Sequence, residues 1–321
     1  MERPPFPPDA GDAARSVGGD TALRSRSMRP RLHLIAAFLF LAACGKDDLP
    51  RGAPVRATSA VPSWAHVSKE QVVAADLLTV PVAFENAIGM RFVLIPAGTF
   101  AMGSPASEEG RSGDETQHQV TLTRAYYMSV LETTNAQYRM FKADHDSGFA
   151  VRPVRGRSPG ISLNGDTQPA VKVSHDDATA FVAWLERRTG ERRYRLPTEA
   201  EWECACRSGT TTPFAFGTTI SANQAVFLGE TTLPVGSRSA SPWGLYDMQG
   251  NALEWCADWY GDYSDLPLTD PTGPSSGSAR VVRGGVWANQ PSFLRCAHRD
   301  AAPPERRDAV GFRLVASRGA P

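Results

Sequence analysis

The sequence predicts a loop-rich α+β domain, and three observations lead to that class. Ser174 with Asp177 and Thr198 with Glu201 have the spacing of capping boxes, so helices are expected at about 175–189 and 199–207. After residue 207, short apolar runs and turns dominate, which is typical of strands and loops. The chain of 321 residues also contains 25 Pro and 28 Gly, which favours many turns and little regular secondary structure.

The charge balance argues against one class of partner. The chain has 34 basic and 34 acidic residues, so there is no overall positive field to attract a phosphate backbone. We therefore expect no nucleic-acid partner.

The N-terminal segment has the features of a lipoprotein leader. Residues 1–27 show no apolar period and are expected to be a disordered extension. Residues 28–44 combine a basic start at Met28, an apolar run too short to span a bilayer, and small residues before Cys44. This order predicts a lipoprotein signal peptide, translation from Met28 and lipid on Cys44. The alternative is an ordinary cleaved signal with an incidental cysteine.

A lipid on Cys44 would make the membrane a partner and hold the protein in the cell envelope, facing the periplasm. Gly45 favours delivery to the outer membrane, whereas Asp47 and Asp48 leave the inner membrane open. Residues 45–83, with several prolines and a charged stub, are predicted to be a tether, although Ser68 has the spacing of a capping box with Gln71. The folded domain is expected from residue 84.

Within that domain, the elements follow in order. Arg91 to Phe100 predicts a strand that runs into a turn, and apolar runs at 120–122 and 126–130 predict the next strands. A helix is expected to begin at Thr134, and Gly190 is placed to end the helix at 175–189.

The helix at 199–207 has two distinct faces in projection. Trp202 and Cys206 lie on a face predicted to be buried, because they are four residues apart. Glu199 and Glu203 share another face, which we expect to be wetter.

Several stretches together resemble one known family. The most specific is Arg195-Leu196-Pro197-Thr198-Glu199-Ala200-Glu201-Trp202-Glu203. It is joined in family order by residues 92–104, 243–255, 283–287, 294–299 and 311–314. Over roughly residues 84–317 the chain resembles the formylglycine-generating enzymes, also called sulfatase-modifying factor domains. The resemblance implies a C-type-lectin-like α+β fold with low regular secondary structure.

A calcium site is expected on the stretch from Asp247 to Glu254. Two carboxylates and neighbouring carbonyls on a bend that contains Gly250 suit a hard cation. In the resembled family this loop binds structural calcium, with side chains at the positions of Asp247 and Glu254 and carbonyls at those of Gly250 and Ala252. The alternative is a polar turn in which Asp247 and Asn251 cap their own backbone.

The cysteines argue against the family's best-known reaction. Formylglycine-generating enzymes bind copper(I) between two cysteine thiolates, and soft ligands of this kind select that metal. By resemblance the first of these positions is Asn289, and residues 290–294 supply no second cysteine. Copper is therefore not expected.

The remaining cysteines are predicted to have structural roles. Cys296 matches a family cysteine that forms a disulfide with one placed like Cys206, so the resemblance implies the pair Cys206–Cys296. Cys204 and Cys256 are either a second bridge or two buried thiols.

These observations predict a lipoprotein with a sulfatase-modifying-factor-like domain that binds a peptide, a protein segment or a small ligand. The expected pocket lies between segments Trp287–Arg299 and Glu305–Phe312. The alternative is an enzyme of the same fold with different chemistry, such as a siderophore-maturation-like oxidoreductase, with Trp287, Asn289 and Arg299 lining the site. A true formylglycine-generating oxidase is the least favoured reading. No catalytic residue is assigned, because no nucleophile elbow, phosphate loop or zinc motif is present.

Overall fold

The structure is a computed structural model that describes residues 60–150, 160–191 and 193–317. The predicted leader at 28–44, the lipid site Cys44 and residues 45–59 of the predicted tether lie outside the described residues. Within the described ranges, no helix has the length and apolar character that a membrane span requires.

Four α-helices and fourteen short strands are present in the described part of the chain. The helices are α1 (Lys69–Leu78), α2 (Asn135–Arg139), α3 (His175–Thr189) and α4 (Glu199–Arg207), with a 3₁₀ turn η1 (Pro291–Leu294). The strands are β1 (Ala83–Glu85), β2 (Arg91–Ile95), β3 (Gly98–Met102), β4 (His118–Leu122), β5 (Tyr126–Ser129), β6 (Phe149–Ala150), β7 (Ile161–Ser162), β8 (Tyr194–Arg195), β9 (Leu253–Trp259), β10 (Leu268–Thr269), β11 (Arg280–Arg283), β12 (Asp300–Ala302), β13 (Val310–Gly311) and β14 (Val315–Ala316).

The largest sheet joins the beginning of the domain to its end. Its order is β1-β2-β5-β14-β8, so the last strand of the chain lies between β5 and β8. β2 pairs antiparallel with both β1 and β5, and Phe92 to Ile95 are fully buried in the core. The single strand predicted from Arg91 to Phe100 is in fact two strands, β2 and β3, in separate sheets. The break falls at Pro96, which has no N–H to offer a ladder.

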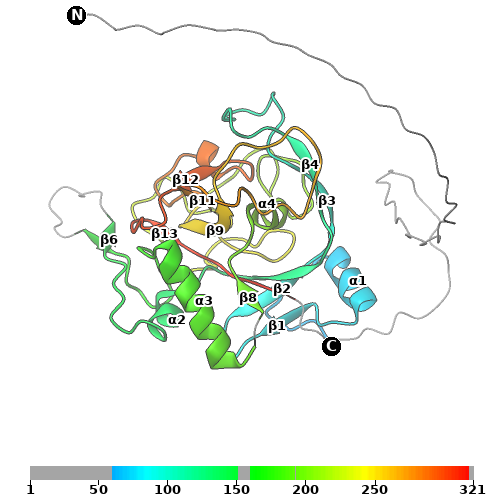
Figure 1. Cartoon of the computed structure of the whole chain (residues 1–321). Coiled ribbons are helices and arrows are strands. Elements are labelled where there is room, and N and C mark those ends of the chain that lie inside the picture. The colour runs from blue at the N-terminus through cyan, green and yellow to red at the C-terminus, as the bar shows by residue number, and fades with distance from the viewer. Residues whose placement is uncertain (1–59, 151–159, 192, 318–321) are drawn as a thin grey trace, which may run out of the picture. The chain divides into compact units, whose positions relative to one another are not determined.

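Two further sheets surround α4. One has the order β12-β11-β9-β13 and the other β10-β4-β3. Figure 1 shows α4 near the middle of the domain, with β3 and β4 on one side and β9 and β11 on the other. All nine residues of α4 are buried as a result.

The helix starts are set by local side-chain hydrogen bonds, as the sequence predicts. Capping boxes form at Ser68, Thr134, Ser174 and Thr198, in each case with the residue three positions later. Gly190 ends α3 in the left-handed conformation.

The fold takes in part of the stretch predicted to be a tether. Gln71 of α1 is fully buried, and its Nε2 donates to the carbonyls of Leu94 (2.8 Å) and Trp243 (3.1 Å). These bonds attach α1 to the largest sheet and to the loop before β9. The folded unit therefore begins before residue 84.

Candidate functional site

Glu203 is the centre of a buried ionic network beneath the candidate site. Its Oε1 accepts from Gly103 N (2.8 Å) and from Arg207 Nε (2.9 Å). Its Oε2 accepts from Arg283 Nη2 at 2.5 Å. The prediction that Glu199 and Glu203 lie on a wetter face is wrong, because arginines from distant segments cover that face and keep both carboxylates buried.

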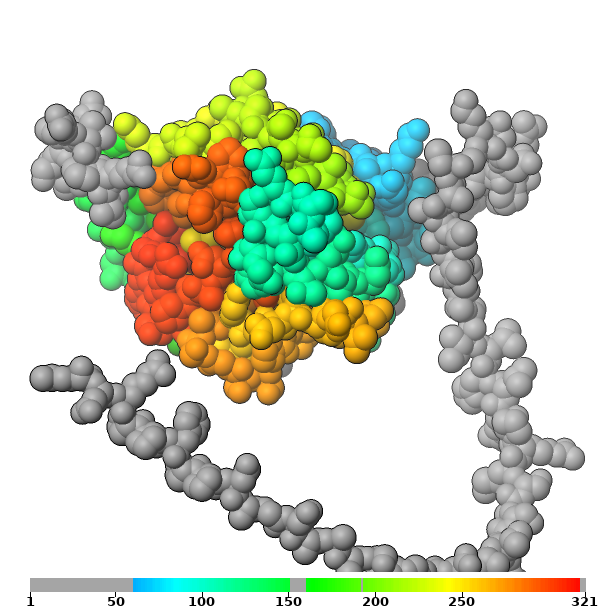
Figure 2. All heavy atoms as spheres, turned by 90° about the horizontal axis from the view of Figure 1, so that it is seen from above, coloured from blue at the N-terminus to red at the C-terminus, as the bar shows by residue number. Residues whose placement is uncertain are grey.

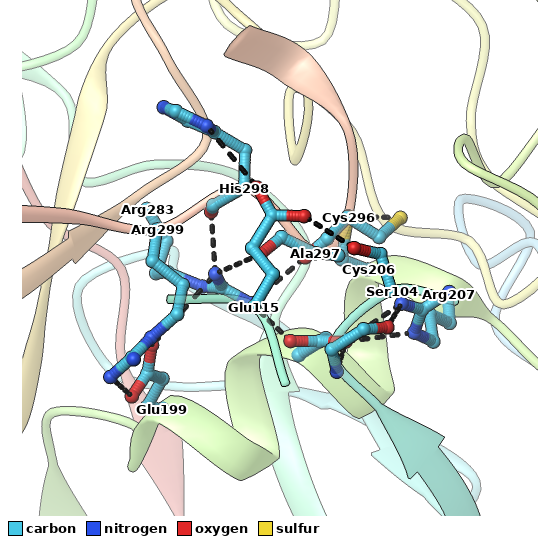
Figure 3. Close-up of polar contacts among 12 residues, drawn as sticks. Ser104, Glu115, Glu199, Cys206, Arg207, Arg283, Cys296, Ala297, His298 and Arg299 are labelled. Atoms are coloured by element: carbon cyan, nitrogen blue, oxygen red, sulfur yellow. Dashed lines mark hydrogen bonds and ion pairs between the residues drawn. The ribbon is translucent and has the colours of Figure 1, made fainter. Parts of the chain in front are cut away.

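Arg283 extends the network to residues 283–314, which we call the closing segment. Its guanidinium donates to the carbonyls of Cys296 (2.8 Å), Ala297 (3.1 Å) and His298 (2.5 Å), as Figure 3 shows. Burial opposes its charge, but nearby Tyr263 and Glu203 hold the pKa of Arg283 above its usual value. α4, β11 and the segment after η1 are thus held as one unit.

Arg299 forms an ion pair with Glu199 and also lines a cavity. Its Nε and Nη2 donate to the two oxygens of Glu199 at 2.7 and 2.9 Å. The guanidinium also lies over the rings of Tyr263 (3.6 Å) and Tyr260 (4.6 Å), a cation–π arrangement. The positive charge of Arg299 is therefore already balanced by Glu199.

A further ion pair fixes the loop between β3 and β4 against the closing segment. Both oxygens of Glu115 accept from Arg295, at 2.6 and 2.7 Å, and Ser104 Oγ donates to Oε2 at 2.7 Å. Burial alone would raise the pKa of Glu115, yet these hydrogen bonds hold that pKa well below its usual range.

Two neighbouring cavities open beside α4. The smaller, of about 350 Å³, we call the Arg299 cavity, and the larger, of about 770 Å³, the Arg195 cavity. Figure 2 shows the face on which the teal segment with β3 and β4 lies beside the gold segment with β10, which pairs with β4. The Arg299 cavity is lined by Met102, His118, Glu199, Ala200, Asp258, Trp259, Gly261, Asp262, Tyr263, Ser264, Leu268, Pro271, Thr272, Gly273, Pro274 and Arg299.

Asp258 lines both cavities, together with Pro271 and Thr272. It is 4% exposed, and its Oδ2 accepts from Glu199 N (2.9 Å) at the start of α4. Burial, reinforced by the Glu199 carboxylate, raises the pKa of Asp258 to about 7. The carboxyl group therefore exists in both protonation states near neutral pH. Sequence reasoning missed Asp258, because a lone acid at the end of a strand carries no signal of its own.

The three predicted pocket residues do not meet in this cavity. Arg299 lines it, whereas Trp287 and Asn289 are not among its lining residues. Trp287 is buried in a small apolar cluster with Val226 and Ala252. Asn289 Oδ1 accepts from Val286 N at 2.7 Å and closes a tight turn. The pocket between Trp287–Arg299 and Glu305–Phe312 stays a prediction.

The predicted calcium ligands lie in a buried acidic region. Asp247 is 4% exposed; its Oδ2 accepts from Gly236 N (2.6 Å), and its Oδ1 is buried without a hydrogen-bond partner in the described chain. Glu254 is fully buried, and Arg313 Nε donates to its Oε2 at 2.7 Å and to its Oε1 at 2.9 Å. Trp202 Nε1 donates to the same carboxylate at 2.7 Å.

Glu132 is a third buried acid here that sequence reasoning missed. It accepts from Asn251 Nδ2 (2.7 Å) and Ala252 N (3.1 Å). Burial, together with Asp247 and Glu254, raises the pKa of Glu132 well above its usual range, and burial raises the pKa of Asp247 to about 6. Three acids thus lie near two arginines, Arg313 and Arg238, so acid is in excess over base.

The residues present fit a hard cation in one respect. The unpartnered Oδ1 of Asp247 and the excess of acid over base are what a cation would satisfy. Within the described residues, however, no three His, Cys, Asp or Glu side chains converge on one metal position. A calcium ion at Asp247 would therefore depend on backbone carbonyls, which is the role predicted for Gly250 and Ala252.

The cysteines are buried thiols in this structure. Cys206 Sγ and Cys296 Sγ are 2.7 Å apart and both side chains are fully buried. The predicted partners are thus neighbours, and the disulfide stays a prediction. Cys204 and Cys256 are also buried and free.

Comparison with known proteins places these features in context. A family model described as the sulfatase-modifying factor enzyme 1-like domain matches residues 80–318. Serine/threonine-protein kinase pkn1 of Chlamydia caviae is 33% identical over 241 residues, which cover 70% of this chain and 37% of that protein. The chain therefore spans less than half the length of this kinase.

Formylglycine-generating enzyme of Streptomyces coelicolor is 29% identical over 283 residues, which cover 70% of this chain and 88% of that enzyme. Among solved structures, PvdO from Pseudomonas aeruginosa is 32% identical with a TM-score of 0.64, and the match covers 74% of this chain and 98% of that one.

Proposed function

The chain belongs to the sulfatase-modifying factor enzyme 1-like family and has the predicted α+β, loop-rich formylglycine-generating-enzyme fold; from that premise we propose that it is a ligand-binding member. In this proposal the protein is a lipoprotein anchored through Cys44, and its domain faces the periplasm. Residues 289–294 supply no cysteine for a copper site. The ligand is a peptide or a small molecule held in the Arg299 and Arg195 cavities.

The observation that carries the proposal is the pair of cavities that share Asp258, Pro271 and Thr272. Their volumes, about 350 and 770 Å³, are in the range of small-molecule sites. Their walls combine aromatic and apolar side chains with a few charged groups, which is the composition that binding pockets favour.

The residues at the copper position support a function other than sulfatase activation. Asn289 stands where the resemblance puts the first copper cysteine, and its side chain is used to close a turn. Amide oxygens are poor ligands for copper(I), which prefers thiolates. Titration with copper(I) and a cysteine-containing substrate peptide is expected to give no oxygen-dependent product.

A panel of short synthetic peptides and amino-acid derivatives, followed by calorimetry, tests the proposal directly. Thr272→Trp places a large ring where the cavities adjoin, so we expect it to abolish binding of any panel member that the parent protein binds. Thr269→Trp is the matched control, because Thr269 is exposed on β10 and lines neither cavity. Binding that survives Thr272→Trp would contradict the proposal.

The second candidate is an enzyme of the same fold with different chemistry, such as a siderophore-maturation-like oxidoreductase. Asp258 favours it, because a carboxyl group with a pKa of about 7 beside a cavity suits general acid–base catalysis at neutral pH. Mass spectrometry of bound panel members separates the two functions. A pure binding protein returns its ligand unchanged, whereas an enzyme returns a product whose formation is lost in Asp258→Asn.

A further inference from the structure

The first described residues lie against the loop that leads to the predicted calcium ligands. Gln71 of α1 is fully buried, and its Nε2 donates to the carbonyls of Leu94 (2.8 Å) and Trp243 (3.1 Å). Other side chains of the same segment, Trp64 among them, pack against the main core. We call residues 60–80 the N-terminal strap and residues 241–247 the strap loop.

Gly244 shows how closely the strap lies on this loop. Its φ is +75°, and a Cβ atom at this position would lie 1.8 Å from the carbonyl oxygen of His66 and 2.9 Å from its carbonyl carbon. Only glycine permits so close an approach between two stretches of backbone. A side chain at position 244 and a docked strap therefore exclude each other.

The strap is attached without any share in a sheet. The backbone hydrogen bonds that residues 60–80 form with described residues all stay within the strap, as from Ala65 N to Pro62 O. The first backbone bond to the largest sheet comes after it, from Leu94 N to Val82 O at 2.9 Å. A segment held by side chains alone opens at a lower free energy than strands in a sheet. The strap can therefore open while the rest of the domain stays folded.

The strap loop carries this contact on to Asp247. The ring of His66 meets the ring of Tyr246 edge-on, with centroids 6.4 Å apart, and Tyr246 O accepts from Arg313 Nη2 at 2.8 Å. Asp247 follows with a φ of +56°, and its Oδ2 accepts from Gly236 N at 2.6 Å. Non-glycine residues adopt this left-handed conformation where their surroundings hold them in it. The strap is part of those surroundings.

We propose that the N-terminal strap is a releasable clasp that holds the strap loop, and with it Asp247, in its present conformation. The docked strap fixes the loop, and an open strap leaves it free to move. Because Asp247 is a predicted cation ligand, the strap would set the geometry of that site. Residues 60–80 and 241–247 line neither the Arg299 nor the Arg195 cavity, so this inference goes beyond the proposed function and does not depend on it.

Gly244→Ala in the full-length chain tests the clasp, with Gly89→Ala as its matched control. Both glycines have a φ of +75°, but a Cβ at Gly89 would meet nothing within 4 Å. The two variants therefore carry the same backbone strain, and only one of them crowds the strap. Amide hydrogen exchange, read by mass spectrometry, should be at least about tenfold faster in α1 and at Tyr246 in Gly244→Ala, and unchanged there in Gly89→Ala.

Gln71→Met releases the strap by a second route. Gln71 and Gln137 both accept from the cap residue of their own helix, Ser68 N at 2.7 Å and Thr134 N at 3.1 Å. Only Gln71 also donates to distant carbonyls. Gln71→Met should therefore speed exchange in α1 and at Tyr246, whereas Gln137→Met, which loses the same half of a capping box, should leave both unchanged.

The pattern of exchange across the domain decides the proposal. Faster exchange in α1 and the strap loop, with β9 and β11 as slow as in the parent, supports a clasp that opens by itself. Faster exchange in α1 with an unchanged strap loop would overturn the coupling. Equal acceleration in β9 and β11, or failure of both Gly244→Ala and Gln71→Met to fold, would overturn the separate opening and make the strap an inseparable part of the domain.

Discussion

Replacement of Glu203 by Gln tests whether the buried ionic network holds the domain together. Glu203 is fully buried and accepts hydrogen bonds from Gly103, Arg207 and Arg283. Glu203→Gln keeps the shape of the side chain but removes the negative charge. Arg207 and Arg283, both nearly fully buried, would then lose their shared counter-ion.

The expected loss follows from the cost of an unpaired buried charge. Removal of one member of a buried ion pair costs about 3–5 kcal/mol. For a domain of this size, 1 kcal/mol corresponds to about 2–4 °C in melting temperature, so Glu203→Gln should lower it by about 6–20 °C. The loss should exceed that of any exposed acid, because solvent screens exposed pairs to about 1 kcal/mol or less.

Thermal and urea unfolding, followed by circular dichroism, measure this loss. Glu109→Gln is the matched control, because Glu109 is exposed and the change is chemically identical. A double variant, Glu203→Leu with Arg283→Met, should recover part of the stability, since it removes an acid and a base together. A loss below about 1 kcal/mol for Glu203→Gln would refute the reasoning that this network is a main support of the fold.

Three further predictions concern the metal, the thiols and pH. Calcium at about a hundred times its dissociation constant should stabilise the domain by about 2.7 kcal/mol, which corresponds to roughly 5–11 °C in melting temperature. Asp247→Asn should abolish that gain, and magnesium should produce a smaller one. Oxidising conditions should yield a Cys206–Cys296 linked peptide in non-reducing mass spectrometry, and Cys296→Ala should prevent the link; the same peptide map with Cys204 linked instead would contradict the pairing. The folded-state pKa of Asp258 is about 7, and its ordinary value is 3.8. The stability that comes from its protonated form is therefore fully present below about pH 4 and is lost as pH rises through 7. The free energy of unfolding should therefore fall between about pH 4 and 7 in the parent and fall less in Asp258→Asn. Asp265→Asn, an exposed change outside both cavity walls, should behave as the parent.

The helix starts could be predicted from the sequence because their determinants are local. Ser174 and Asp177, three residues apart, form the cap of α3 by themselves, and Gly190 ends it with a backbone conformation that glycine adopts freely. The same logic identified α4 at Thr198. Such signals depend only on neighbours in the chain, so distant packing does not alter them.

The environment of α4 could not be predicted, because its partners come from far along the chain. Glu203 meets Arg283 across 80 positions and Glu199 meets Arg299 across 100. A helical projection shows two acids on one face and therefore predicts that this face is exposed to solvent. The projection contains no information on the arginines that cover it. The tether prediction failed in part for a similar reason: the buried Gln71 makes its contacts with Leu94 and Trp243.

The candidate site was predicted least well, because loops build it. Of the three pocket residues, Arg299 lines a cavity, and its pairing with Glu199 could not be read from spacing. Asp258 and Tyr263 come to line one cavity with Glu199 only in the folded chain. Loops of this kind have no hydrophobic period, so their side chains cannot be assigned to a face in advance.

The ionic network also explains how the scaffold can keep its form while the chemistry of its site changes. The ion pairs Glu203–Arg283, Glu115–Arg295 and Glu254–Arg313 link α4, the loop after β3 and β9 to the start, the middle and the end of the closing segment. None of these pairs uses residues 289–294, where the resemblance puts the copper cysteines. Replacement of those cysteines, as by Asn289 here, therefore leaves the main supports of the fold untouched. When the residues that stabilise a fold differ from those that form its site, the site can change while the fold is kept. This is consistent with similar proteins whose names differ as much as protein kinase and formylglycine-generating enzyme.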